Sequence, residues 1–353
     1  KTDGFNLTDR PWGRAYYAGV GAGTAAAPYL SVVNAHSAIA TPGGVIIGGP
    51  LNGYAFAPNG SLYLANLGVK PGAGTIAVGG EGGQYYGSSA VAYSQDSRAF
   101  GRASYDLTPS IEVFAQGFYT QVVDHTHAFN DFRFPGTPNT LTIFSDNAYL
   151  QPSVVSALGG ATSFTLGREN LEEGVAQNTF TNDEINVRAG LDGEFGNSWH
   201  WQASYSDAIV TLQADMGDFN SQHLYAAADA VVGPNGDIVC RVTLTNPGLY
   251  PGCVPADFLG AGNESPAAAA YIRGVSTYRI RNEQSIGSID LSGDLLSLPA
   301  GPLAFAVGGL YRTQSLLETS NANPAEPPST VGLPGMPSTA LWYRLANTGI
   351  ASG

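Results

Sequence analysis

A few groups of residues have types and spacings that could do chemistry. His125-x-His127, preceded by Asp124, would place two imidazoles on one face of a strand, where they could bind a transition metal. A solvated strand end is the simpler interpretation, and we predict no metal site. Gly19-x-Gly21-x-Gly23 and the glycine-rich run at 79–83 resemble phosphate-binding loops. Neither run follows a strand and opens a helix, and no Gly-Lys-Ser/Thr occurs, so we predict turns or flexible loops there.

Paired carboxylates are the remaining candidates for acid–base chemistry. Glu172-Glu173 is expected in a loop and Asp183-Glu184 at the start of a strand, where charges are solvated by default. The chain contains no Gly-x-Ser-x-Gly, no His-Glu-x-x-His and no Cys-x-x-Cys. We therefore predict no catalytic residues and no cofactor, and we expect the protein not to be an enzyme.

The composition excludes several classes of protein. The 353 residues contain 15 Lys+Arg and 28 Asp+Glu, for a net charge of −13, and 43% of the residues are hydrophobic. Such a chain is too apolar to be disordered. Nucleic acid is not expected as a partner, because binding phosphates requires clustered basic residues and this chain has two lysines.

The two cysteines and the longest apolar run bear on the compartment. Cys240 and Cys253 lie in a polar stretch rich in Gly and Pro, which favours a disulfide in an oxidising compartment over two unpaired thiols. The longest apolar run, 295–311, is interrupted by Pro299, Gly301 and Pro302 and is too short for a membrane helix.

The strongest pattern in the sequence is an alternation of apolar and polar residues with period two. Between Glu184 and Phe195 the odd positions are apolar or glycine and the even positions are mostly charged or polar. The same pattern recurs, and it predicts six strands that pair as three hairpins with short turns. The expected strands are Arg98–Leu107, Ile111–Thr120, Glu184–Phe195, Trp199–Ser206, Ile286–Leu295 and Ala304–Gln314.

The connections between the hairpins are long, about 60 residues each, at roughly 122–181 and 213–278. Compact soluble domains rarely contain structureless loops of about that length. Outer-membrane barrels combine short periplasmic turns with long extracellular loops. The fold class we predict is therefore all-β, as a segment of an antiparallel transmembrane β-barrel. We expect a loop-rich extracellular region with one or two strands at 1–96, the barrel wall at 97–320 and a further extracellular loop at 321–353.

The apolar face of these strands supports a membrane location. It is rich in Ala and Gly near the middle of each strand, whereas the core of a soluble sandwich is filled by bulkier side chains. Aromatic residues lie towards the strand ends, as in the girdles at a membrane interface. The predicted interface aromatics are Tyr105, Trp199, Trp201, Tyr205 and Tyr311.

Several short motifs, in this order, resemble TonB-dependent outer-membrane receptors of the alphaproteobacterial type. The resembling segments are Arg10-Pro11-Trp12; 48–53 with Phe56; 102–107 followed by 111–115; Cys253-Val254-Pro255 with Phe258 and Gly260; 265–268; and 299–302 leading to 307–309 and Tyr311-Arg312. Relatives usually carry an acidic residue where this chain has Leu310. The resemblance covers nearly the whole chain.

The resemblance implies a function and a set of partners. Such receptors are 22-stranded barrels that take up a scarce nutrient, such as a siderophore, vitamin or oligosaccharide, across the cell outer membrane with TonB-derived energy. The implied partners are a plug domain and further barrel strands, TonB with ExbB and ExbD, outer-membrane lipid and lipopolysaccharide, and a small-molecule or oligosaccharide ligand. No segment here resembles the plug, so we expect the chain to be a piece of the receptor.

The polar face would line the barrel lumen. Its candidate lumen residues, which would pair as wall charges, touch the plug or contact the substrate, are Arg98, Arg102, Arg188, Asp192, Glu194, Gln202, Asp290 and Arg312. Loop tyrosines could stack on a sugar or an aromatic chelate, namely Tyr16, Tyr17, Tyr54, Tyr85 and Tyr86. The alternative functions are a surface-displayed structural or adhesive β-protein and a secreted β-sheet hydrolase.

Overall fold

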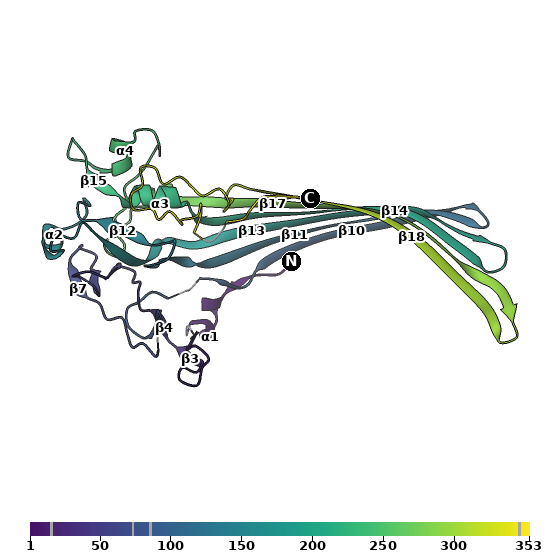
Figure 1. The fold of residues 1–353 in the computed structure, drawn as a ribbon, viewed down its shortest axis with the longest axis horizontal. Coiled ribbons are helices and arrows are strands. Elements are labelled where there is room, and N and C mark those ends of the chain that lie inside the picture. Colours follow the sequence, from purple (N-terminus) through teal and green to yellow (C-terminus); the bar gives the residue numbers. More distant parts are fainter. Residues whose placement is uncertain (15–16, 73, 85–86, 345–346) are drawn as a thin grey trace.

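Six long antiparallel strands form one elongated, curved sheet in the computed structural model, which describes residues 1–14, 17–72, 74–84, 87–344 and 347–353 (Figure 1). Their order across the sheet follows their order along the chain. These strands are β10 (Tyr93–Thr108), β11 (Ile111–Arg133), β13 (Ser163–Phe195), β14 (Trp199–Phe219), β17 (Arg273–Leu298) and β18 (Gly301–Ser320).

The three predicted hairpins are confirmed. β10 pairs with β11, β13 with β14, and β17 with β18, and each pair is joined by one of the predicted short turns. All three turns lie at one end of the sheet, and the longer connections gather at the other end (Figure 1).

The strands extend well beyond the segments that alternation predicted. β11 continues to Arg133 and β13 starts at Ser163, so most of the expected loop at 122–181 is strand. β14 and β17 likewise shorten the second expected loop. The extensions were missed because both faces are polar or covered by other segments there, which removes the period-two signal. Register shifts between His127 and Asp131 further disturb the alternation.

The first 92 residues form short strands rather than long hairpins. β9 continues towards β10 and pairs with β1, while β5, β6 and β7 join the loop end of the large sheet beside β13. The elements of this region are β1 (Phe5–Asn6), η1 (Leu7–Asp9), α1 (Pro11–Arg14), β2 (Tyr17–Val20), β3 (Leu30–Val33), β4 (Ala35–Ser37), β5 (Val45–Ile47), β6 (Tyr54–Phe56), β7 (Leu62–Leu64), β8 (Ile76–Val78) and β9 (Ser89–Val91).

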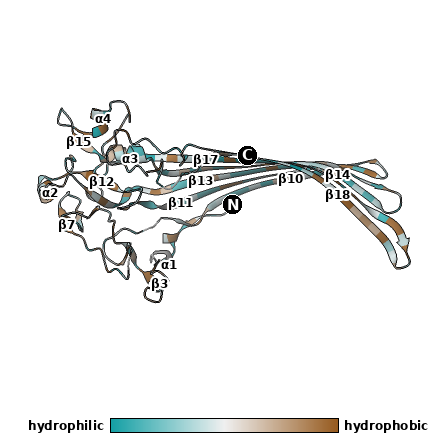
Figure 2. Cartoon of the chain, viewed as in Figure 1, coloured by the Kyte–Doolittle hydropathy of each residue, from teal (hydrophilic) through white to brown (hydrophobic). Residues whose placement is uncertain are grey.

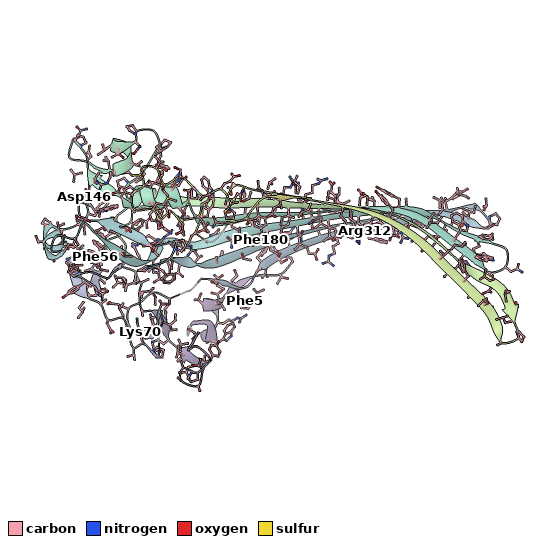
Figure 3. All side chains as sticks on the ribbon, in the orientation of Figure 1. Phe5, Phe56, Lys70, Asp146, Phe180 and Arg312 are labelled. Carbon is pink, nitrogen blue, oxygen red and sulfur yellow. A yellow bond between two sulfur atoms is a disulfide. The ribbon has the colours of Figure 1, made fainter. Side chains whose placement is uncertain are left out.

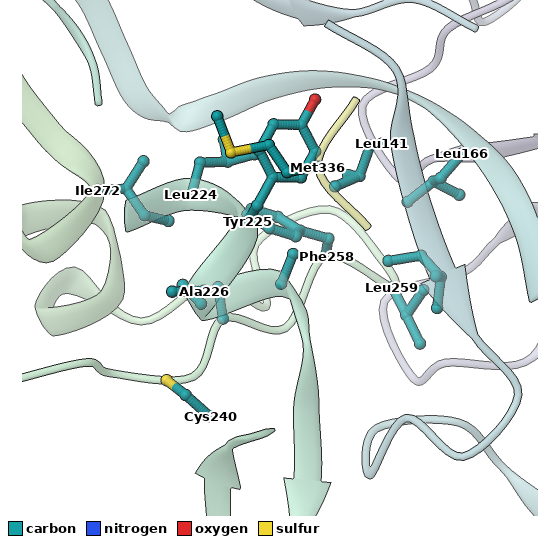
Figure 4. Packing of buried hydrophobic residues seen from close by; sticks show 14 of the residues in the cluster. Leu141, Leu166, Leu224, Tyr225, Ala226, Cys240, Phe258, Leu259, Ile272 and Met336 are labelled. Atoms are coloured by element: carbon teal, nitrogen blue, oxygen red, sulfur yellow. The ribbon is translucent and has the colours of Figure 1, made fainter. Parts of the chain in front are cut away.

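The connections at the loop end contain the main hydrophobic core. Leu224, Tyr225, Phe258 and Ile272 are buried there against residues of β5 and β13 (Figure 4). The elements that carry this core are β12 (Leu141–Phe144), α2 (Pro152–Ala157), α3 (Ser221–Ala228), β16 (Ile238–Cys240), α4 (Arg241–Thr245) and α5 (Pro266–Ile272). β15 (Ala230–Val232) pairs with β16, and β19 (Ala351–Ser352) lies apart and pairs with β18. The core therefore stabilises the loops, whereas the turn end of the sheet has no such packing among the described residues.

The predicted disulfide between Cys240 and Cys253 is present. Cys240 is fully buried at the start of α4, and beside it Arg241 bridges Asp146 and Asp229 at 2.7 and 2.9 Å. Asp146 lies at the loop end of the molecule, far along the sheet from Arg312 (Figure 3). The disulfide closes the loop 240–253 within the segment 229–253, and the Arg241–Asp146 ion pair ties this segment to the residues after β12.

No helix among the described residues is long and apolar enough to cross a membrane.

Removal of the disulfide should loosen one loop and leave the sheet intact. A Cys240→Ala/Cys253→Ala double variant should lose about 2–4 kcal/mol of local stability, because the disulfide restricts the conformations that the loop can adopt when it unfolds. Protease cleavage within 229–253 should become faster, while cleavage elsewhere keeps its rate. Reductant should reproduce the effect in the wild type and add nothing in the double variant. Unchanged cleavage in both would show that the ion pairs and the core suffice.

Candidate functional site

The strand register places all eight candidate lumen residues on one face of the sheet. Arg102, Gln116, Arg188 and Arg312 belong to one row of side chains across the strands. The second polar-face row from it towards the short turns contains four carboxylates and one amide: Asp106, Glu112, Asp192, Gln202 and Asp290. Alternation along each strand thus places a basic row and an acidic row on one face, separated by a row that contains Phe114.

Part of this face is a connected polar network. Arg188 donates to Gln202 at 2.7 Å, and Gln202 donates to Asp192 at 2.6 Å. Arg102 donates to Gln116 at 2.9 Å and lies 3.6 Å from Glu112. These contacts join four of the predicted lumen residues to their neighbours.

Phe114 breaks the polar pattern of this face for a structural reason. Its buried ring lies between two arginines, with the Arg102 and Arg188 guanidinium carbons 4.7 and 5.6 Å from its centroid. Cation–π contact orients both guanidinium groups along the sheet. Phe114 therefore belongs to the charged network.

The other candidate lumen residues on this face lie outside the polar network around Arg102 and Arg188. Arg98 pairs with Asp96 at 2.6 Å, and Glu194 lies 3.1 Å from His200. The acidic row lines a hollow of about 660 Å³ near the short turns. Asp290 and Arg312 lie on the same face, and the described residues offer no ion-pair partner for either.

The opposite face carries an apolar band with an aromatic border on each side. Near the turns, Phe195 stacks on Trp199, which contacts Phe305. On the other side, Tyr205 and Tyr311 occupy one row, and the next row of this face contains Asp207 and Thr313. Figure 2 shows hydrophobic and hydrophilic residues alternating along the strands here.

The border that contains Tyr205 and Tyr311, on the side away from the turns, does not stay at one level across the sheet. On β11 it is formed by Tyr119, which precedes Gln121 on this face. Tyr311 on β18 is level with Ala115 of β11, which is four residues nearer to the turns than Tyr119. The border thus lies four residues nearer to the turns on β14 and β18 than it does on β11.

Charged side chains become buried where the strands reach the loops. Asp131 Oδ2 lies 2.8 Å from Arg133 Nε, and Asp131 Oδ1 lies 2.9 Å from Arg344 Nε. Arg344 also lies 3.5 Å from Asp218 on β14. All four of these side chains are buried. The Asp131 carboxylate of β11 thus pairs with two buried arginines, and one of them, Arg344, belongs to the C-terminal segment.

A third buried arginine, Arg168, attaches a loop to β13. Arg168 donates to the carbonyl oxygens of Phe258 and Gly260 at 3.1 and 3.4 Å, and to Glu172 at 2.9 Å. Glu172 in turn accepts a hydrogen bond from the Gly262 amide at 2.5 Å. The segment 256–264 is thereby held against the start of β13.

Carboxyl groups outnumber arginines in this buried cluster. Burial raises the pKa of Glu169 to about 7, although Asn130 donates a hydrogen bond to it. Burial also raises the pKa of Glu264 to about 7, and burial together with Glu264 raises that of Glu173 well above its usual range. All three carboxyls lie in the loop-end part of the structure, outside the apolar band. Several of them therefore retain protons near neutral pH.

Our expectation that Glu172 and Glu173 are solvated loop charges is wrong. Both lie in β13, where Glu173 is 3% exposed, because the segment 256–264 covers them. Asp183 also lies within β13 and accepts hydrogen bonds from Tyr119 and Gln121. The only sequence signal for the buried cluster was the high density of charged residues at 168–173, and solvated polar loops show the same density.

The histidine pair is separated into two different contacts. His125 contacts the Thr179 hydroxyl at 3.0 Å, and His127 contacts the Asn6 side chain at 3.1 Å. No group of three or more potential protein ligands among the described residues could hold a metal ion. Of the loop tyrosines, Tyr54 is exposed on β6, and Tyr16, Tyr85 and Tyr86 lie outside the described residues.

No protein-family model, curated protein or solved structure matches this chain.

The buried cluster should contribute far more to stability than an exposed ion pair. Asp131→Asn removes the charge opposite Arg133 and Arg344, and it should lower the free energy of unfolding by about 3–5 kcal/mol, because the buried Arg133 loses its ion-pair partner while Arg344 retains Asp218. Asp96→Asn, which removes the exposed partner of Arg98, should cost about 0–1 kcal/mol. Denaturant unfolding of both variants checks this, and equal losses would contradict the assigned role.

Proposed function

We propose that the long sheet is part of the wall of an outer-membrane β-barrel. The observation that carries this proposal is the bordered apolar band on one face, opposite a charged polar face. Along β13 the apolar parity runs from Ile185 to Phe195, about 33 Å of strand, which is enough to cross an apolar layer of about 25 Å.

The exposure of the apolar face argues against a soluble sandwich. Tyr105, Tyr205, Ile289 and Tyr311 are 71, 58, 59 and 74% exposed. A sandwich would bury this face beneath a second sheet, and none of the described segments covers it. Contact with lipid accounts for an apolar surface of this extent.

The edges of the sheet imply additional strands. Apart from a bridge between Thr2 and Ser94, no described residue pairs with the outer edge of β10, and β19 pairs with only two residues of β18. Unpaired backbone groups cost several kcal/mol each in lipid. We propose that further strands complete the barrel and that a plug domain contacts the polar face.

The activity we propose is uptake of a scarce nutrient with energy from TonB, assisted by ExbB and ExbD, and not catalysis. The resemblance of the sequence motifs to TonB-dependent receptors supports it, as does a polar face whose charges are held by neighbouring side chains. The ligand would be a siderophore, a vitamin or an oligosaccharide that enters from the loop end.

A charge on the apolar face should interfere with membrane insertion. Ile289→Arg should reduce the amount of folded protein in the outer membrane, because arginine near the middle of the bilayer costs about 2–4 kcal/mol. Gln284→Arg, on the polar face of the same strand, should insert normally. Quantifying folded protein in membrane fractions distinguishes the two, and equal loss would refute the assignment of faces.

Extraction tests the location, and growth tests the activity. The whole protein should require detergent for release and should migrate differently on gels before and after heating. Release of intact protein by salt or chelator would instead favour a surface-displayed structural or adhesive protein.

Deletion of the gene should slow growth when iron, cobalamin or an oligosaccharide is limiting, to the same extent as loss of TonB. Normal growth under every such limitation would contradict the uptake role.

A further inference from the structure

Two buried carboxyl groups from distant parts of the chain meet at the loop end of the sheet. Glu173 belongs to β13, and Glu264 ends the segment that precedes α5. The residues are 3% and 5% exposed. All four carboxyl oxygens are shielded from solvent, and none of them accepts a hydrogen bond from an N–H or hydroxyl of the described residues.

A shared proton is the simplest way to join the Glu173 and Glu264 carboxyl groups. The two side chains face each other closely enough for one carboxyl to donate to the other. If both were ionised, two like charges would be buried in contact. A single shared proton removes one charge and supplies a donor.

The other charged groups near the pair do not remove the need for a shared proton. Those facing the pair are Arg168 and Glu172 on β13, and Asp131 and Arg133 on β11, while Arg273 of β17 donates to the carbonyl oxygen of Glu173. Arg133 is paired with Asp131, and Arg168 with Glu172. The guanidinium groups of Arg133 and Arg168 are thus already bound to other carboxylates.

We propose that Glu173 and Glu264 form a proton-dependent latch that holds the segment 256–264 against β13 and releases it when the shared proton is lost. The segment lies between β13 and the β5–β6 region, where the Gly260 amide donates to the Gly43 carbonyl oxygen and the Gly262 amide to Glu172. Loss of the proton places a second negative charge in the pair and opens both contacts.

The direction of the pH dependence follows from the latch. The closed state binds the proton more tightly than the open state, so closure is favoured below the ordinary carboxyl range, about pH 4.5, and weakens as pH rises to about 7 and above. The proposal does not depend on transport, because the test measures protection of the loop and not uptake.

Hydrogen exchange of the whole protein tests the latch. Protection factors of the Gly260 and Gly262 amides, corrected for intrinsic exchange, should fall about tenfold between pH 6 and pH 8. Glu173→Gln/Glu264→Gln keeps the size of both side chains and removes the charges, so its protection should change less than about twofold over this range. Glu326→Gln, at an exposed carboxylate, should retain the full pH dependence.

A further variant separates the latch from the other buried carboxyl. Glu169→Gln removes a group near the Gln84 segment and should leave the pH dependence of the two amides unchanged. Loss of the dependence in this variant, or its persistence in the double variant, would overturn the proposal. So would wild-type protection that does not change between pH 6 and pH 8.

Discussion

The structure depends on one register maintained across six strands. Because side chains alternate between the faces, a slip of one residue in any pairing would exchange the apolar and polar faces of every strand beyond it. The short turns fix this register at one end of each hairpin, so Arg102 and Arg188 remain on the same face as Phe114. The charged network and the aromatic borders are both consequences of that pairing.

The two ends of the sheet are stabilised by different interactions. Near the turns there is little packing beyond the strands themselves, and the described part of the chain leaves the apolar side chains exposed. Near the loops, a hydrophobic core and a buried group of arginines and carboxyls tie β11, β13 and β14 to the connecting segments. Buried charges are costly unless paired, and this restricts the loops to arrangements that supply the partners.

The sequence predicts the turn end of the sheet well and the loop end poorly. Alternation located all three hairpins because one face is apolar and the other polar, and the polar, Gly/Pro-rich surroundings of Cys240 and Cys253 indicated their disulfide. The strand extensions were missed because other segments cover them, and coverage depends on distant residues. Arg168 illustrates this, since its partners at 258–260 are about 90 residues away. Local charge density at 168–173 does not distinguish a solvated loop from a buried cluster.

The displacement of the aromatic border from Tyr119 to Tyr311 implies an inclination of the strands relative to the apolar band. Averaged over the four steps from β11 to β18, the shift is about one residue per strand, although Tyr205 and Tyr311 share one row. About 3.3 Å over an interstrand spacing of about 4.8 Å corresponds to an average angle of about 35° between the strands and the normal to the band. Strands of closed membrane barrels are inclined by about 35–45°. A cylinder closed with this average shear would bring Tyr119 and Tyr311 to the same level, although they lie four residues apart in the open sheet drawn flat.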